Sequence, residues 1–86
     1  MNITVSGNVQ GVGFRYSTKN IANSLGVKGF VKNLYNGDVY IEAEGNKVQL
    51  QHFIEWCRKG SSYSNVHEVK IEEDALKEFT QFKISY

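Results

Sequence analysis

The sequence predicts an α+β fold in which two helices pack on one face of an antiparallel sheet of four or five strands. Two observations carry this prediction. Stretches in which apolar and polar residues alternate, as they do in half-buried strands, are interrupted twice by stretches whose apolar residues recur at helical spacing. The dipeptide Asn36-Gly37 also separates two of the alternating stretches, and this pair is the strongest short-range signal for a β-hairpin.

The first half of the chain predicts the order strand, helix, strand, strand. Residues 2–9 alternate, and a loop rich in glycine follows them. After this loop the sequence predicts a helix. Its apolar face lies at positions i, i+3, i+4 and i+7, which are Thr18, Ile21, Ala22 and Leu25. Gly26 is placed to cap this helix at its C-terminus. Residues 28–34 and 39–43 alternate on either side of the hairpin signal, so they predict two antiparallel strands.

The second half predicts another helix and one or two closing strands. Asn46 is suited to cap the helix at its start, and Gly60 to end it. Its apolar face consists of Leu50, Phe53, Ile54 and Cys57. Residues 67–72 alternate, with His67 on the same side as Val69 and Ile71, and residues 82–86 alternate again. The order βαββαβ, with a short extra strand at the end, is the split-βαβ or ferredoxin-like arrangement.

Size and composition narrow the classes of function. With 86 residues, the chain is expected to form one domain over residues 1–86 with one site. The net charge of +1 provides no strong field for nucleic acid or anionic lipid, and no apolar run approaches the roughly 20 residues that span a bilayer. A single cysteine, Cys57, leaves no partner for a disulfide within the chain. His52 and His67 have no carboxylate in register to support a metal site. We therefore expect a cytoplasmic monomer with no metal, cofactor, nucleic acid or membrane partner.

The loop between the first strand and the first helix is a candidate anion site. The N–H groups at the start of a helix have no partner within it, and they lie at the positive end of its dipole. Gly11 and Gly13 carry no side chain that would hold an oxyanion at a distance, and Arg15 could grip two oxygens of a phosphate. These residues alone leave open that the glycines only form a turn and the arginine only faces solvent. The nucleotide-binding patterns GxGxxG and GxxxxGK[ST] do not occur.

Two stretches resemble the signatures of one enzyme family. Residues 7–18 read Gly-Asn-Val-Gln-Gly-Val-Gly-Phe-Arg-Tyr-Ser-Thr, which is similar to the acylphosphatase signature GxVQGVxFRxxT at every fixed position. Residues 26–33, followed by the turn at residues 36–39, resemble the second signature of that family, a GxVxN segment leading into a turn of the Asp-Gly type. Asn36 stands where the family usually has Asp, and both residues suit the turn. The resemblance extends over essentially the whole chain, as in a small free-standing acylphosphatase.

The resemblance implies hydrolysis of the carboxyl–phosphate bond of acyl phosphates without a metal, with phosphate or other oxyanions as competing ligands. It implies that the phosphate is bound by the loop residues Gln10, Gly11, Val12, Gly13, Phe14 and Arg15. It further assigns catalytic roles to Arg15, which binds the phosphate, and to Asn33, which orients the attacking water, with Thr18 in a supporting position. From the residues alone, Asn33 is better explained as a turn residue that leads into the hairpin, and Thr18 is explained at least as well as a helix residue packed on the sheet.

The proposed chemistry needs few side chains. The departing carboxylate has a pKa of about 4 and needs no general acid. Phosphoryl transfer depends mainly on positioning and on charge stabilisation, which N–H donors and one guanidinium can supply. An amide is too weak a base to remove a proton, but the oxygen of Asn33 can accept a hydrogen bond from water. The strand that ends at Asn33 is expected to approach the loop that leaves the first strand.

Other functions remain open from the sequence. The same fold hosts non-catalytic modules that bind RNA or small ligands, and residues 28–31 echo part of an RNA-binding motif. In RNA-recognition domains this motif belongs on the third strand, but here the residues fall on the second predicted strand. Their position therefore counts against RNA binding. A domain that handles carbamoyl phosphate within a larger maturation enzyme is a further alternative, although the start and stop within 86 residues favour a free-standing enzyme. Four tyrosines could line an acyl-binding surface: Tyr16, Tyr35, Tyr40 and Tyr63.

Overall fold

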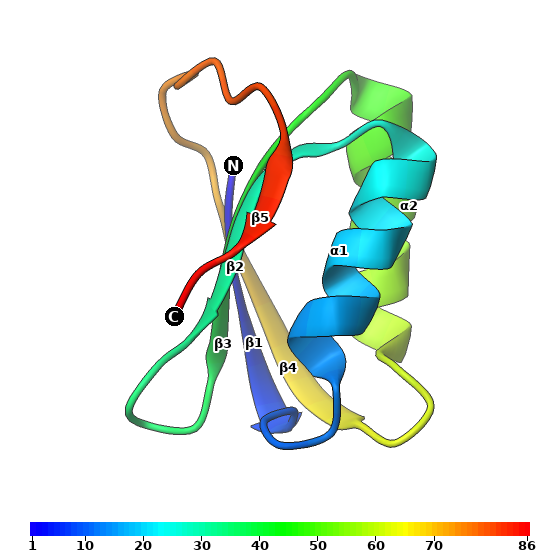
Figure 1. Cartoon of the computed structure of the whole chain (residues 1–86), viewed down its shortest axis with the longest axis vertical. Coiled ribbons are helices and arrows are strands. Elements are labelled where there is room, and N and C mark those ends of the chain that lie inside the picture. Colours follow the sequence, from blue (N-terminus) through cyan, green and yellow to red (C-terminus); the bar gives the residue numbers. More distant parts are fainter.

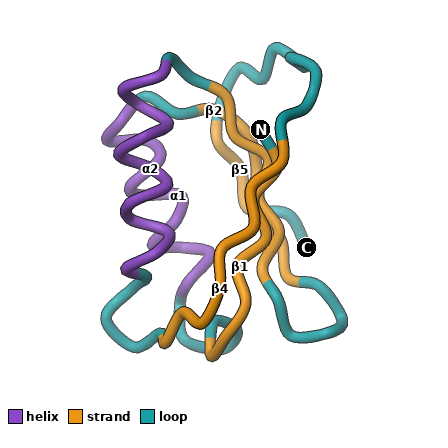
Figure 2. Tube along the Cα trace, turned by 180° about the vertical axis from the view of Figure 1, so that it is seen from behind, coloured by secondary structure: helices purple, strands orange, loops and turns teal.

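Two helices lie side by side on one face of a five-stranded sheet in the computed structural model, which describes residues 1–86 (Figures 1 and 2). The elements follow the chain in the order β1 (Asn2–Asn8), α1 (Phe14–Leu25), β2 (Lys28–Asn33), β3 (Val39–Glu44), α2 (Lys47–Lys59), β4 (Asn65–Glu72) and β5 (Phe82–Ile84). The predicted ferredoxin-like order, with a short extra strand, is confirmed.

The sheet is mixed: four strands form the predicted antiparallel sheet, and the fifth joins its edge in the parallel direction. The strand order is β4-β1-β3-β2-β5, and every neighbouring pair is antiparallel except β2 and β5, which run parallel. The loop after β4 stays at the end of the sheet where β2 begins, as Figure 1 shows. Strand β5 therefore starts beside the start of β2 and runs in the same direction.

The hydrophobic core lies between the helices and the sheet. Alternate residues of β1 and β3 face it and are fully buried: Ile3, Val5, Val39, Ile41 and Ala43. The helices contribute Phe14, Ala22, Phe53 and Cys57, and β5 contributes Phe82. The predicted ends of both helices are confirmed. The N–H groups after Leu25 bond to the carbonyls of the last turn of α1, and Asn46 and Gln49 form a reciprocal capping box at the start of α2.

A bulge in β4 alters the predicted alternation of that strand. The register with β1 shifts between Ser6 and Gly7, so that Ser6 pairs with Glu68 but Gly7 pairs with Val66. His67 is the extra residue of the bulge and is exposed, whereas Val66 packs against the core. His67 therefore does not share a face with Val69, because one inserted residue moves the side chains that follow it to the opposite side.

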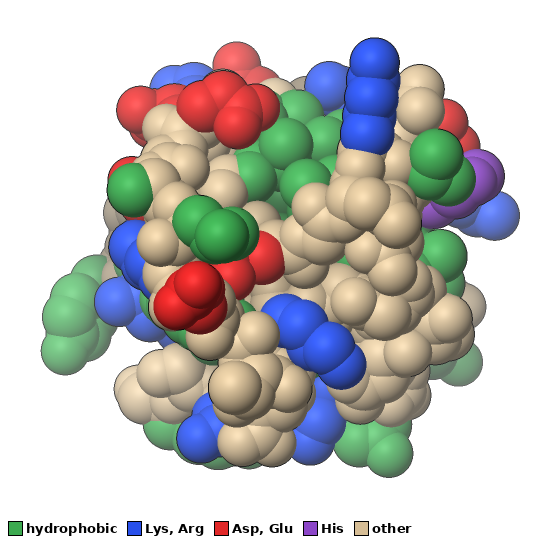
Figure 3. All heavy atoms as spheres, turned by 90° about the horizontal axis from the view of Figure 1, so that it is seen from above, with side chains coloured by type: hydrophobic (Ala, Val, Ile, Leu, Met, Phe, Trp, Pro, Cys, Tyr) green, Lys and Arg blue, Asp and Glu red, His purple; other side chains and the backbone are tan.

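The loop of residues 73–81 is anchored on the face of the sheet that carries no helix. The Lys77 ammonium donates to the carboxylates of Glu42 and Asp74, the second at 2.8 Å. Hydrogen bonds from Lys77 and from the Ala75 N–H hold the pKa of Asp74 at about 2. Seen from the end where this loop lies, acidic, basic and apolar side chains all reach the surface (Figure 3).

Aromatic contacts attach the same loop to β2. The ring of Phe79 meets the ring of Phe30 edge-on, with the ring centres 5.9 Å apart. The Phe79 N–H also donates to a carboxylate oxygen of Glu44 at 2.9 Å. These contacts lie just before β5 and hold the start of that strand beside β2.

Neither helix is long and apolar enough to cross a membrane.

Candidate active site

The loop after β1 and the end of β2 meet at one end of the sheet (Figure 1). Both strands run toward this end, because α1 returns the chain to the opposite end before β2 begins. A pocket of about 180 Å³ opens there. It is lined by Val9, Gly11, Gly13, Phe14, Arg15, Tyr16, Asn33, Ile84 and Tyr86. The expectation that Asn33 approaches the glycine loop is confirmed, since both line the same pocket.

The loop presents backbone donors to this pocket. Gly11 and Gly13 adopt left-handed conformations, with φ of 74° and 75°, which other residues rarely adopt. The N–H groups of residues 10–13 donate to no group of the protein, and those of the first turn of α1 have no acceptor within the helix. Helix α1 also has no side-chain N-cap and no acidic residue in its first turn. The loop is thus an uncompensated positive helix end, suited to an anion.

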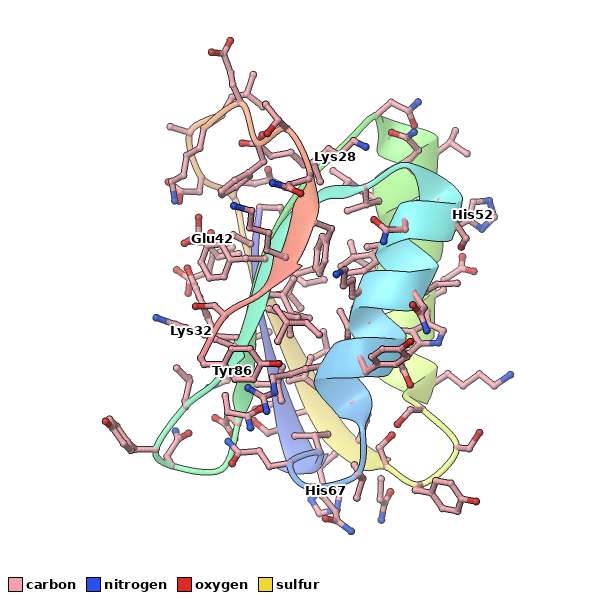
Figure 4. The ribbon with its side chains drawn as sticks, in the orientation of Figure 1. Lys28, Lys32, Glu42, His52, His67 and Tyr86 are labelled. Atoms are coloured by element: carbon pink, nitrogen blue, oxygen red, sulfur yellow. The ribbon has the colours of Figure 1, made fainter.

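Arg15 projects from the first turn of α1 and is held by the C-terminal segment. Its Nη1 donates to the Ser85 carbonyl at 3.4 Å, and its Cζ lies 4.8 Å from the centre of the Tyr86 ring. Tyr86 lies near the end of β2 (Figure 4). The sequence carries no signal for these contacts, because they depend on the parallel pairing that places β5 beside β2.

Asn33 lines the pocket, and its side chain carries an acceptor without a partner in the protein. Its Oδ1 is buried and has no hydrogen-bond partner. Side chains alternate along a strand, so Asn33 shares the helix-covered face with Val31, whereas Lys32 points to the other side, over the ring of Tyr40 (Figure 4). An unpaired buried acceptor costs about 1–3 kcal/mol. A donor that bonds to this oxygen offsets that cost.

The remaining predicted site residues do not line the pocket. The side-chain amide of Gln10 donates to the carbonyls of Leu34 and Asp38 in the β2–β3 turn. Val12 packs against the core. Thr18 is buried, and its hydroxyl donates to the Phe14 carbonyl at 2.7 Å, which is a bond within α1. Gln10 and Val12 therefore contribute to the loop through their backbones, and Thr18 supports the helix behind it.

The whole chain matches a known family. A family model described as Acylphosphatase matches residues 1–84. The chain belongs to the acylphosphatase family. The acylphosphatase of Archaeoglobus fulgidus is 42% identical over 86 residues, which cover 100% of this chain and 97% of that protein. The crystal structure of acylphosphatase from Bacillus subtilis matches with a TM-score of 0.94 and 41% identity, and the match covers 99% of this chain and 96% of that one.

A longer protein contains a similar domain. The crystal structure of T. kodakarensis HypF matches with a TM-score of 0.87 and 29% identity, covering 99% of this chain but only 11% of that one. The acylphosphatase relatives match over nearly their full length. Family membership therefore assigns the chain acylphosphatase activity, the hydrolysis of acyl phosphates, and does not favour the RNA-binding or ligand-sensing alternatives.

Other titratable groups lie away from the acylphosphatase pocket. Cys57 is buried on α2, and burial raises the pKa of its thiol to about 12. His52 is exposed on α2, and His67 is exposed at the bulge of β4 (Figure 4). No three His, Cys, Asp or Glu side chains come together as a set of metal ligands. The pocket is thus lined by four polar side chains, together with the backbone N–H groups of the loop: Arg15, Tyr16, Asn33 and Tyr86.

The four tyrosines considered for an acyl-binding surface separate in space. Tyr16 lines the pocket, and Tyr35 lines a groove that adjoins it through Arg15 and Asn33. Tyr40 donates to Glu42 at 2.8 Å on the helix-free face, and Tyr63 is exposed in the loop after α2. Of these four, only Tyr16 and Tyr35 therefore lie at the pocket or beside it.

Proposed function

We propose that the chain hydrolyses acyl phosphates by in-line attack of a water held by Asn33, with the phosphoryl group bound by Arg15 and by the backbone of residues 10–15. The observation that carries this proposal is the convergence of three kinds of group on one pocket. They are the side-chain amide of Asn33, whose Oδ1 has no partner in the protein, the Arg15 guanidinium and the free backbone donors of the glycine loop.

The reaction proceeds by one displacement at phosphorus. The water oxygen forms a bond to phosphorus while the bond from phosphorus to the acyl oxygen breaks, and the bonding pair leaves with the carboxylate. The leaving carboxylate has a pKa of about 4, so it departs without a proton donor. The proton of the attacking water passes to a phosphoryl oxygen of the substrate. Arg15 and the loop N–H groups stabilise the charge on the equatorial phosphoryl oxygens.

The mechanism is proposed to need neither a metal nor a second copy of the chain. Arg15 and the positive end of α1 supply the charge that a cation provides in many phosphoryl-transfer enzymes. Activity should therefore persist in a chelator, and specific activity should be independent of protein concentration. Inorganic phosphate and other oxyanions should compete with the substrate for the loop.

The test is the release of inorganic phosphate from benzoyl phosphate in the presence of a chelator, with Arg15→Ala and Asn33→Ala compared with the wild type. Each substitution should lower kcat/KM by the equivalent of about 2–4 kcal/mol, roughly 30- to 1000-fold. Exposed residues on the helices give matched controls, Arg58→Ala and Asn23→Ala, which should leave kcat/KM unchanged. Wild-type kcat/KM in either site variant would refute the role given to that residue.

A further inference from the structure

The side chain of Gln10 joins the glycine loop to the turn that follows Asn33. Its amide nitrogen donates to the Leu34 carbonyl at 2.7 Å and to the Asp38 carbonyl at 2.8 Å. These two carbonyls also close the β2–β3 turn, because Leu34 N–H donates to Asp38 at 2.8 Å and Gly37 N–H donates to Leu34 at 3.2 Å. Both hydrogens of the Gln10 amide are thus used at the base of the hairpin.

We propose that Gln10 is a positioning residue that fixes the distance between the phosphate-binding loop and the Asn33 amide, and that kcat depends on it. This inference rests on the proposed function of the loop and of Asn33. Gln10 itself does not line the pocket. It acts through the two groups that do.

The strand order explains why such a link is needed. The loop follows β1 and Asn33 ends β2, but β3 lies between these strands in the sheet. The backbone ladder therefore connects the two catalytic parts only indirectly, through β3. The two bonds of Gln10 are the hydrogen bonds that join residues 9–13 directly to residues 33–38.

The conformation of the loop makes the link more important. Gly11 and Gly13 follow Gln10, and glycine has the most backbone freedom of all residues. Gln10 lies between this flexible stretch and the end of β1, so its two bonds hold the first part of the loop in place. Without them, a phosphoryl group bound in the loop could shift relative to the water on Asn33.

The consequence for kinetics is specific. Displacement of reacting groups by about 1 Å can cost roughly 100-fold in rate. The loop N–H groups and Arg15 still bind phosphate when the link is lost, because neither depends on the Gln10 side chain for its donors. Loss of the link should therefore lower kcat by roughly ten- to a hundredfold and change KM and the inhibition constant of inorganic phosphate by less than about threefold.

The test uses Gln10→Met, which keeps the length of the side chain and removes its donors. Gln10→Asn is made as well, because its shorter side chain cannot reach both carbonyls and it keeps the test valid if the methionine variant does not fold. The matched control is Gln49→Met. It removes the capping bond from Asn46 N–H at the start of α2, which lies at the opposite end of the molecule (Figure 1). Unfolding in urea measures the stability of each variant, and kcat and KM are measured with benzoyl phosphate.

A double-mutant cycle with Asn33→Ala decides whether Gln10 acts through Asn33. If it does, Gln10→Met should lower kcat strongly in the wild type and by less than about twofold in the Asn33→Ala background. Unchanged kcat in the folded Gln10 variants, or an equal loss in both backgrounds, would overturn the inference. Wild-type kcat in Asn33→Ala alone would instead overturn the proposed role of Asn33, so the two failures are distinguishable.

Discussion

Replacing Tyr86 with alanine removes the aromatic ring that lies over the Arg15 guanidinium. The Cζ of Arg15 is 4.8 Å from the ring centre, and Tyr86 as a residue is 97% exposed. At an exposed site such a cation–π contact is worth about 0.5–1 kcal/mol, equivalent to a two- to fivefold change in an equilibrium constant. The bond from Arg15 to the Ser85 carbonyl involves the backbone and is retained. We therefore expect the inhibition constant of inorganic phosphate to rise about two- to fivefold.

The assay is competition by inorganic phosphate against benzoyl phosphate hydrolysis. Because Tyr86 is almost fully exposed, loss of its ring should change the free energy of unfolding in urea by less than about 0.5 kcal/mol. Tyr63→Ala is the matched control, since Tyr63 is also exposed and lies in the loop after α2. An unchanged inhibition constant in Tyr86→Ala would refute the argument that the ring restrains Arg15. A loss above about 50-fold would also refute it, because it exceeds what one exposed contact can supply.

Three further predictions concern stability and reactivity. The buried thiol of Cys57, with its pKa raised to about 12, should resist iodoacetamide at neutral pH in the native chain and react once urea unfolds it. A carboxyl whose pKa is lowered by folding stabilises the fold above its unfolded pKa and loses that effect as the pH falls through the folded value. The stability difference in urea between wild type and Lys77→Met should therefore shrink as the pH falls from the ordinary range of Asp74 toward about 2. Gly29→Ala should lower the free energy of unfolding by at least about 2 kcal/mol, because its Cβ would overlap a carbonyl of β3 at a φ of 144°. Gly37→Ala, whose Cβ meets open space, should cost about 1 kcal/mol, and equal costs for the two would contradict this reasoning.

Most of the elements could be predicted because their signals are local. The apolar face of α1 ends at Gly26, and Asn46 caps α2, as the sequence indicates. The bulge in β4 could not be predicted, because residues 67–72 alternate regularly in the sequence. Only the pairing with β1 shows that His67 is an extra residue. The direction of β5 could not be predicted from the sequence either. A strand of three residues carries no information about which edge it joins.

Part of the site could likewise be predicted from local sequence, and part could not. The glycine loop and Arg15 could be located from the sequence, because an anion site at a helix start depends on consecutive residues. Placing Asn33 at the site required the predicted fold as well, because Asn33 lies at the end of the next strand along the chain. The supporting contacts, from Gln10 to the hairpin and from Tyr86 to Arg15, could not be predicted, because each joins residues 24 to 71 positions apart that meet only when the sheet is assembled.

The order of the elements, the glycine loop at the start of α1 and the resemblance to the acylphosphatase family could all be predicted from the sequence. Each of these depends on spacing along the chain or on short motifs. Three features required the assembled fold: Gln10 bonds to the β2–β3 turn, β5 runs parallel to β2, and the Arg15 guanidinium lies against the Tyr86 ring. These contacts arise because strands pair and helices pack on one face of the sheet. Both bring together residues that are far apart in the chain and share no local sequence pattern.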